Sequence, residues 1–192
     1  MENEIVRLIS KYIPLTEEDK KAVTKCIPIK KYKKGTILLR EGQIATESYF
    51  NLSGIVRQYY LFDGEEKTTY FFTEEESIAS LTSYVKKVPA NHYFSCVEDC
   101  TLAVLTYDCE QELCNKVPKF ETLCKYSIEG EFGKQQEMLS SFIMQSPKER
   151  YLHLLQTRPE LMNRVPQHQL ASYLGVKPES LSRIRKRIAT EG

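Results

Sequence analysis

The chain has 192 residues, of which 41% are hydrophobic and 28% are charged. These values are typical of a globular protein and exclude disordered, collagen-like and coiled-coil chains. No apolar run reaches the roughly 18 residues of a membrane-spanning helix, and no secretory signal is recognisable, so we expect a cytoplasmic protein without membrane contact. The six cysteines are too few for a disulfide framework, and we expect free thiols and no metal site. An iron–sulfur or redox-sensing role of these cysteines is the alternative.

The formal net charge of +1 is unevenly distributed along the chain. Residues 147–192 contain nine Lys or Arg and four Asp or Glu, so this segment carries +5 and the remaining residues carry −4. A basic end of this kind is the electrostatic pattern of a nucleic-acid-binding segment.

The first half of the chain has the pattern of a β domain. Thr16 and the acidic residues after it predict a short helix that reaches Val23. From there to residue 107, short segments rich in β-branched and aromatic residues alternate with turn signals, and a second short helix is expected within 77–84. Asp63-Gly64 suits a two-residue hairpin turn. Many short strands with regular turns predict an antiparallel β-roll, or jelly roll, over residues 1–117.

A long helix is predicted for residues 118–145, because apolar residues recur there at helical spacings after Pro118. The resulting stripe consists of Phe120, Leu123, Cys124, Ile128, Phe132, Leu139, Phe142 and Ile143. The stripe has two possible partners. One is the β domain of the same chain; the other is a second copy in a homodimer, where Gly130 and Gly133 would permit close approach.

Residues 146–192 are predicted to form a separate helical domain. Ser146, followed by proline and then by Glu149, has the pattern of a capping box that begins a helix. Further on, Pro166 can open a helix that Gly175 ends, and Pro178 can open the next one. Two short helices joined by a glycine turn predict a helix-turn-helix, whose second helix enters the major groove of DNA. The fold class is therefore α+β, with a β-roll, a long connecting helix and an all-α end.

The second of these helices has two chemically distinct faces. At 100° per residue, Leu181, Ile184 and Ile188 fall on one apolar stripe. The opposite arc contains Glu179, Ser182, Arg183, Lys186 and Arg187. Arginine can donate two hydrogen bonds to guanine, glutamate can accept one from cytosine, and serine or lysine can hold phosphates. The alternative is an ordinary solvated helix face without a partner.

The order of β-roll, long helix and helix-turn-helix resembles the cyclic AMP receptor and fumarate-nitrate regulator (Crp/Fnr) family of bacterial transcription factors, from about Lys30 to Ala189. The most specific match is the segment G-V-K-P-E-S-L-S-R-I that starts at Gly175. The resemblance implies that its glutamate, first serine and arginine occupy DNA-reading positions. The resulting set of predicted DNA contacts is Glu179, Ser180, Ser182, Arg183, Lys186 and Arg187. It also implies double-stranded DNA and a second copy as partners, and leaves RNA polymerase and a small-molecule effector open.

The cyclic nucleotide site of that family is altered in this sequence. The family uses a Gly-Glu pair that holds the ribose and an Arg-Ser pair that grips the phosphate. Ala79-Ser80 align with the first pair and Ala90-Asn91 with the second, and residues 59–131 contain no arginine. Because the bidentate phosphate grip is missing, we expect no cyclic AMP binding of the family's usual kind. These four residues remain the candidates for an effector pocket, whose ligand the sequence does not identify.

The sequence departs from the family pattern in two further places, an acidic triplet and the segment after the second helix. The acidic triplet at residues 74–76 is expected to lie near the same pocket and to repel an anion. Since the sequence ends at Gly192, we expect no β-hairpin wing after the second helix.

Enzymatic function is not expected. A cupin-type enzyme would use a β-roll with several metal-binding histidines, but this chain has three histidines, of which His92 alone falls in the β domain. No nucleophile-elbow or phosphate-loop motif is present, so no catalytic residue is assigned. We therefore predict a sequence-specific DNA-binding transcription regulator. The alternative is a ligand-sensing or protein-interaction module that does not bind DNA.

Overall fold

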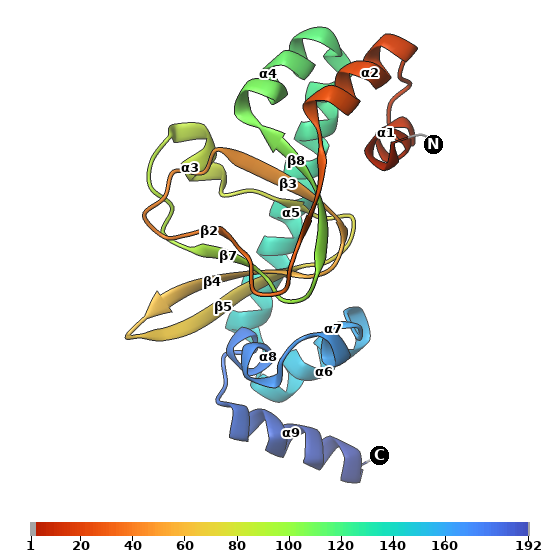
Figure 1. Cartoon of the computed structure of the whole chain (residues 1–192). Helices are drawn as coiled ribbons and strands as arrows, with labels where there is room; N and C mark the ends of the chain where they lie inside the picture. Colours follow the sequence, from red (N-terminus) through yellow and green to blue (C-terminus); the bar gives the residue numbers. More distant parts are fainter. Residues whose placement is uncertain (1–2, 192) are drawn as a thin grey trace.

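The computed structural model describes residues 3–191, which form a β-roll, a long helix beside it and a helical unit at the far end (Figure 1). Helix α2 (Glu17–Cys26) begins with a capping box between Thr16 and Asp19, and it extends one turn beyond the predicted end. Helix α1 (Glu4–Ser10) was not predicted. Seven residues are too few for a clear apolar period. Among residues 3–191, no helix is long and apolar enough to cross a membrane.

The predicted jelly roll is confirmed as two four-stranded antiparallel sheets. The first sheet has the order β1 (Ile29–Tyr32), β8 (Cys100–Thr106), β3 (Glu47–Ser53), β6 (Ser77–Ile78). The second sheet has the order β2 (Ile37–Leu39), β7 (Tyr93–Cys96), β4 (Val56–Phe62), β5 (Glu65–Phe72). The hairpin of β4 and β5 turns at Asp63 and Gly64, whose φ angles of 50° and 77° fit the predicted two-residue turn.

Both faces of the first sheet are apolar. One faces the interior of the roll, and the other is covered by helices. On β3, Tyr49 points into the interior of the roll, whereas Phe50 belongs to an outer cluster with α1 and α2. On β8, Val104 is interior and Leu105 packs against the outer cluster. Side chains alternate along a strand, so neighbouring residues serve opposite faces.

One helix, α3, lies between strands of the roll, and two more, α4 and α5, follow its last strand. The short helix predicted within 77–84 lies further along, since Ser77 belongs to β6 and α3 spans Leu81–Lys86. Helix α4 (Tyr107–Lys116) covers the outer side of the first sheet. The long helix α5 (Pro118–Met144) matches the predicted segment and runs along the roll toward the C-terminal unit (Figure 1).

The C-terminal unit contains α6 (Pro147–Thr157), α7 (Leu161–Arg164), α8 (Gln167–Tyr173) and α9 (Pro178–Glu191). The capping box predicted at Ser146 and Glu149 is present. Helix α7 was not predicted, because one turn of four residues leaves no periodic pattern.

The C-terminal unit packs against the second sheet of the roll through a shared apolar cluster. Phe71 of β5 is fully buried and contacts Tyr173 of α8 edge to face, with ring centroids 5.2 Å apart. The backbone N–H of Thr68 donates to Ser172 Oγ at 2.8 Å, and this hydroxyl donates to the Glu66 carbonyl at 3.0 Å. The two units therefore share one core and a set of hydrogen bonds.

Glu74 and Glu76 of the acidic triplet form ion pairs across this contact, which corrects, for these two residues, the expectation that the triplet repels an anion near the effector pocket. Glu74 accepts two hydrogen bonds from Arg164 of α7, at 2.6 and 3.1 Å, and its pKa falls to about 2 because of this partner. Glu76 is paired with Lys134 of α5 at 2.8 Å and with Arg158 at 3.6 Å. Neutralised by cations of the helical segments, these carboxylates hold α5 and the C-terminal unit against the roll.

Candidate functional site

The turn between α8 and α9 has the geometry of a Schellman motif. Gly175 adopts φ +70°, and its N–H donates to the Ser172 carbonyl at 3.0 Å. The N–H of Val176 donates to the Ala171 carbonyl, also at 3.0 Å. The predicted glycine-ended helix is thus confirmed in its backbone geometry, and the turn fixes the direction in which α9 leaves α8.

The apolar stripe of α9 attaches this helix to the rest of the unit. Leu181 is fully buried, and Ile184 and Ile188 pack at the edge of the same cluster. Leu170 and Leu174 of α8 belong to that cluster as well. The predicted apolar stripe of α9 therefore packs against α8, and this contact sets the rotation of α9 about its own axis.

The opposite arc of α9 faces solvent, as the helical wheel predicts. The exposed residues of this arc are Glu179, Ser182, Arg183, Lys186 and Arg187. Ser180 is half-buried, and its hydroxyl accepts a hydrogen bond from Arg183 Nη2 at 3.4 Å. The six predicted contact residues therefore lie on one helix at the end of the molecule (Figure 1), five of them exposed and Ser180 half-buried. Their contact with DNA stays a prediction.

Arg150 of α6 joins the end of α5 to the end of α8. Its guanidinium donates to the Leu174 carbonyl at 2.9 and 3.2 Å and to the Gln145 carbonyl at 2.7 Å. It also lies 4.6 Å from the centre of the Phe142 ring, at the end of α5. Cationic donors suit helix C-termini, where unpaired carbonyls concentrate negative charge. No sequence pattern predicted this residue, because its acceptors are backbone atoms of two distant segments.

The four predicted effector-pocket residues line one cavity inside the roll. This cavity, of about 510 Å³, is bounded by Ala79, Ser80, Ala90 and Asn91 together with Gln58 and Tyr60 of β4, with His92 just before β7 and with α5. We call it the roll cavity. The alignment therefore brought together residues that share a pocket, and their role in effector binding stays a prediction.

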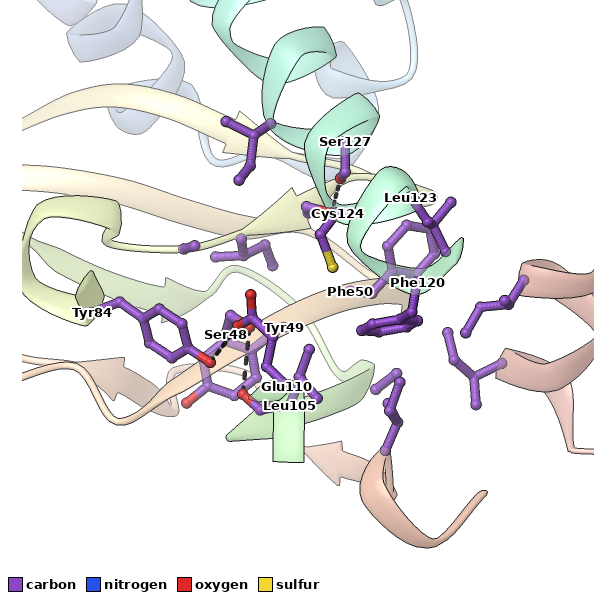
Figure 2. Close-up of a pocket in the computed structure, with 18 of the residues that line it drawn as sticks. Ser48, Tyr49, Phe50, Tyr84, Leu105, Glu110, Phe120, Leu123, Cys124 and Ser127 are labelled. Carbon is purple, nitrogen blue, oxygen red and sulfur yellow. Dashed lines mark hydrogen bonds between the residues drawn. The ribbon is translucent and has the colours of Figure 1, made fainter. Parts of the chain in front are cut away.

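A second cavity, on the outer side of the first sheet, was missed by the sequence analysis. This outer cavity has a volume of about 360 Å³ and lies between the sheet and helices α1, α3, α4 and α5 (Figure 2). The continuous apolar run on β8, from Leu102 to Leu105, was the available signal. A strand that is apolar at successive positions needs cover on both faces.

Comparison with known proteins places this geometry in a known fold. The family model of the cyclic nucleotide-binding domain matches residues 29–117. The c-di-GMP-responsive global regulator CLP of Xanthomonas campestris is 20% identical, with a TM-score of 0.72 over 92% of this chain and 93% of that one. FixK2 of Bradyrhizobium japonicum is 17% identical, with a TM-score of 0.73 over 86% of each chain. A crp/fnr-family regulator from Eubacterium rectale is 18% identical, with a TM-score of 0.73 over 95% and 89%.

The chain has the Crp/Fnr fold. The resemblance predicted from the sequence is thereby confirmed for the architecture, with a cyclic nucleotide-binding domain as its β-roll. No curated protein sequence matches this chain. At these identities the Crp/Fnr neighbours establish the fold, and function has to be argued from the residues of this chain.

The roll cavity lacks the cationic grip that the Crp/Fnr cyclic nucleotide site uses. No Lys or Arg is among its described lining residues, and its charged wall is Glu131 of α5. Burial raises the pKa of Glu131, one of whose oxygens accepts from Lys134 at 3.0 Å. Lys87 lies elsewhere, with its ammonium 3.9 Å from the centre of the Tyr107 ring. A phosphate in this cavity would face a carboxylate without a paired guanidinium.

A cluster of Cys26, Cys109 and Glu112 joins the end of α2 to α4. Their ligand-type atoms lie within 4.8 Å of one another. The carboxylate of Glu112 is already paired with Lys116 at 2.6 Å and approaches Lys25 at 3.9 Å. Two ammonium groups at the carboxylate oppose a further cation, so we assign no metal site to this cluster.

Proposed function

We propose that this chain is a homodimeric, sequence-specific DNA-binding regulator of transcription of the Crp/Fnr type. One observation carries the proposal. The arc of α9 that is rich in arginine, lysine and serine faces solvent, while the opposite arc is fixed in the core. CLP, a global regulator that shares the fold over nearly its whole length, agrees with a regulatory role.

The chemistry of the exposed arc suits both base recognition and phosphate binding. Arg183 can donate two hydrogen bonds to O6 and N7 of guanine, and Glu179 can accept from cytosine N4. Lys186 and Arg187 add positive charge, as expected for residues that hold the DNA backbone. Double-stranded DNA is therefore the proposed partner, and we propose no catalytic role.

In the proposed homodimer, the two copies pair through α5 and each copy contributes one α9 to the DNA contact. Several apolar side chains of this helix are exposed in the single chain, including Phe132 at 61%, Leu139 at 61% and Ile143 at 75%. Exposed apolar residues at spacings of four and seven along a helix favour pairing with a second copy. In such a dimer the two copies of α9 should lie about 34 Å apart, which matches one turn of DNA.

The sensor domain is proposed not to hold cyclic AMP in the family's usual way. The carboxylate of Glu131 in the roll cavity, and the absence of Lys and Arg from its described lining, support this view. Calorimetry with cyclic AMP and cyclic GMP should show no micromolar binding. RNA polymerase remains a further proposed partner, as for transcription factors that act at promoters.

Selection from a pool of random DNA tests the proposal directly. We expect enrichment of a palindrome whose half-sites are about one helical turn apart. Affinity should fall steeply with salt, because Lys and Arg contacts release counterions from the phosphates. No enrichment, together with salt-independent binding to another protein, would favour the alternative of an interaction module without DNA binding.

A further inference from the structure

The outer cavity is a chamber with a defined chemical polarity. Its floor is the outer face of the first sheet, and helices α1, α3, α4 and α5 form its walls. Most of the lining is aliphatic or aromatic, with Phe50 and Phe120 toward the end near α1 (Figure 2). A volume of about 360 Å³ lies within the usual range of small-molecule sites. The cavity is open to solvent, and its lining residues Tyr12, Leu81, Val85 and Ile128 are exposed, so apolar surface stays in contact with water unless a ligand covers it.

Polar groups gather at the other end of the chamber. The Tyr84 hydroxyl donates to Glu110 Oε2 at 2.8 Å, and Ser48 Oγ donates to the Leu105 carbonyl at 3.4 Å (Figure 2). Glu110 lines the cavity, and the hydrogen bond from Tyr84 uses only one of its two carboxylate oxygens.

The charge at this end is negative. Glu110 is the only charged residue among the described lining residues of the cavity. Lys87 lies over the rings of Tyr84 and Tyr107 and does not line the cavity. The thiol of Cys124 points into the chamber (Figure 2), and burial raises its pKa to about 12, so it stays neutral. An anionic head group would therefore meet a carboxylate, whereas a hydroxyl or an ammonium could donate to it.

We propose that the outer cavity binds a small amphiphile, with an apolar body and a hydrogen-bond-donating head such as an alcohol or an amine. The body lies against the sheet between α1 and α5, and the head donates to Glu110. This site lies beside the roll cavity, where a cyclic nucleotide-binding domain would hold its nucleotide. The two cavities share the wall residues Ser77, Ala79, Leu81, Ser127 and Ile128.

The position of this site connects it to the helix that leads to the DNA-binding end. Five residues of α5 line it, from Phe120 to Ile128. The segment from Ser77 to Leu81 separates it from the roll cavity, and Ser77 is hydrogen-bonded to Ser127 of α5 at 2.6 Å. Binding itself does not depend on DNA recognition. The role of the ligand as an effector does rest on the proposed function.

The experiment uses the full chain and the neutral fluorescent probe N-phenyl-1-naphthylamine. We expect saturable binding with an increase in fluorescence, as the probe leaves water for an apolar site. Octan-1-ol and octylamine should displace it, and octanoate should do so at least about tenfold less effectively because of the carboxylate at Glu110. Equal displacement by octylamine and octanoate would overturn the assignment of the head group.

Two pairs of variants locate the site. Leu105→Trp fills the outer cavity and should abolish probe binding. Gln135→Trp alters the wall of the roll cavity but no lining residue of the outer cavity, and should not abolish it. Glu110→Gln should remove the preference for octylamine over octanoate, because it keeps an acceptor for Tyr84 without the charge. Glu112→Gln makes the same change two residues further along α4, outside the cavity, and should leave the preference intact.

The outcomes separate this proposal from the proposed function. If Leu105→Trp fails to fold, Leu8→Trp blocks the same chamber from α1. Absence of saturable binding, or binding that persists in the blocked variant, would overturn the proposal. A separate anisotropy assay with the selected DNA tests the regulator: failure there with intact probe binding would contradict the proposed function alone.

Discussion

Arg183 and Lys186 are exposed neighbours on α9 with different expected roles in DNA binding. Arg183→Ala should remove a bidentate base contact, which costs about 1–3 kcal/mol on the selected site and relaxes preference at one base pair. Lys186→Ala should weaken binding to all sequences alike and lower the salt slope by about one. Fluorescence anisotropy with selected and random DNA at several salt concentrations measures both. Equal losses on the two DNAs for Arg183→Ala would contradict its assigned role.

Gly175 is expected to be required for stability, on two separate grounds. Its φ of +70° is unfavourable for other residues, and an added Cβ would lie 3.0 Å from Cε1 of Phe142. Gly175→Ala should therefore lower the free energy of unfolding by about 1–2 kcal/mol for the backbone conformation alone, and by more if Phe142 cannot move.

Gly35→Ala is the matched control, because Gly35 has φ +80° with nothing within 4 Å of an added Cβ. Urea denaturation of the two variants separates backbone strain from the contact with Phe142. Equal losses would show that the contact adds nothing.

The sequence predicted the exposed arc of α9 but not the residues that depend on contacts between distant segments. The exposed arc of α9 followed from helical periodicity, which decides burial wherever one side of a helix meets a core. Ser180 came from the resemblance alone, and it is half-buried. Arg150 and Glu131 were missed because their roles depend on partners from distant segments. Such convergence leaves no pattern of spacing along the chain.

At the level of elements, α5 carries the prediction about assembly. Leu139→Glu places a charge on an exposed apolar side chain and should convert a dimer to a monomer, since a buried unpaired carboxylate is costly. Analytical ultracentrifugation over a range of concentrations measures the change. Tyr12→Glu alters an exposed aromatic residue of 69% exposure that lies outside α5, in the wall of the outer cavity, and should leave the dimer intact. A wild-type chain that is monomeric at all concentrations would contradict the assembly.

The elements that the sequence predicted are those with long or repeated signals. Helix α5 has 27 residues, so its apolar stripe repeats over several turns and is recognisable in the sequence. The strands of the roll were recognisable because turn signals separate them at regular intervals. Helices α1 and α7 have seven and four residues, too few to show a period. The position of α3 was wrong by a few residues because β6, with two residues, takes the preceding segment.

For the whole molecule, the contact between the roll and the C-terminal unit should be sensitive to acid. The pKa of Glu74 is lowered to about 2 from its ordinary 4.5 because of Arg164. A carboxyl whose pKa is lowered by folding stabilises the folded state. This contribution is fully present at pH values above the ordinary pKa and is lost as the pH falls toward the lowered pKa. Because Glu74 is 39% exposed, we expect a contribution of only about 1 kcal/mol.

Urea denaturation at pH 7 and near pH 3 tests this contribution. Glu74→Gln should lower stability at neutral pH and reduce the further loss on acidification. Glu65→Gln changes a pair with Lys67 in the exposed hairpin and should have a smaller effect at both pH values. An unchanged acid response in Glu74→Gln would show that other carboxylates govern it.

Arg150 bonds the ends of α5 and α8 with a single guanidinium, so neither end can turn without straining the other. The hydrogen bonds therefore restrict hinge motion between the long helix and the C-terminal unit. We expect a rotation of α5 about its own axis to turn α8 with it and, through the turn at Gly175, to reorient α9.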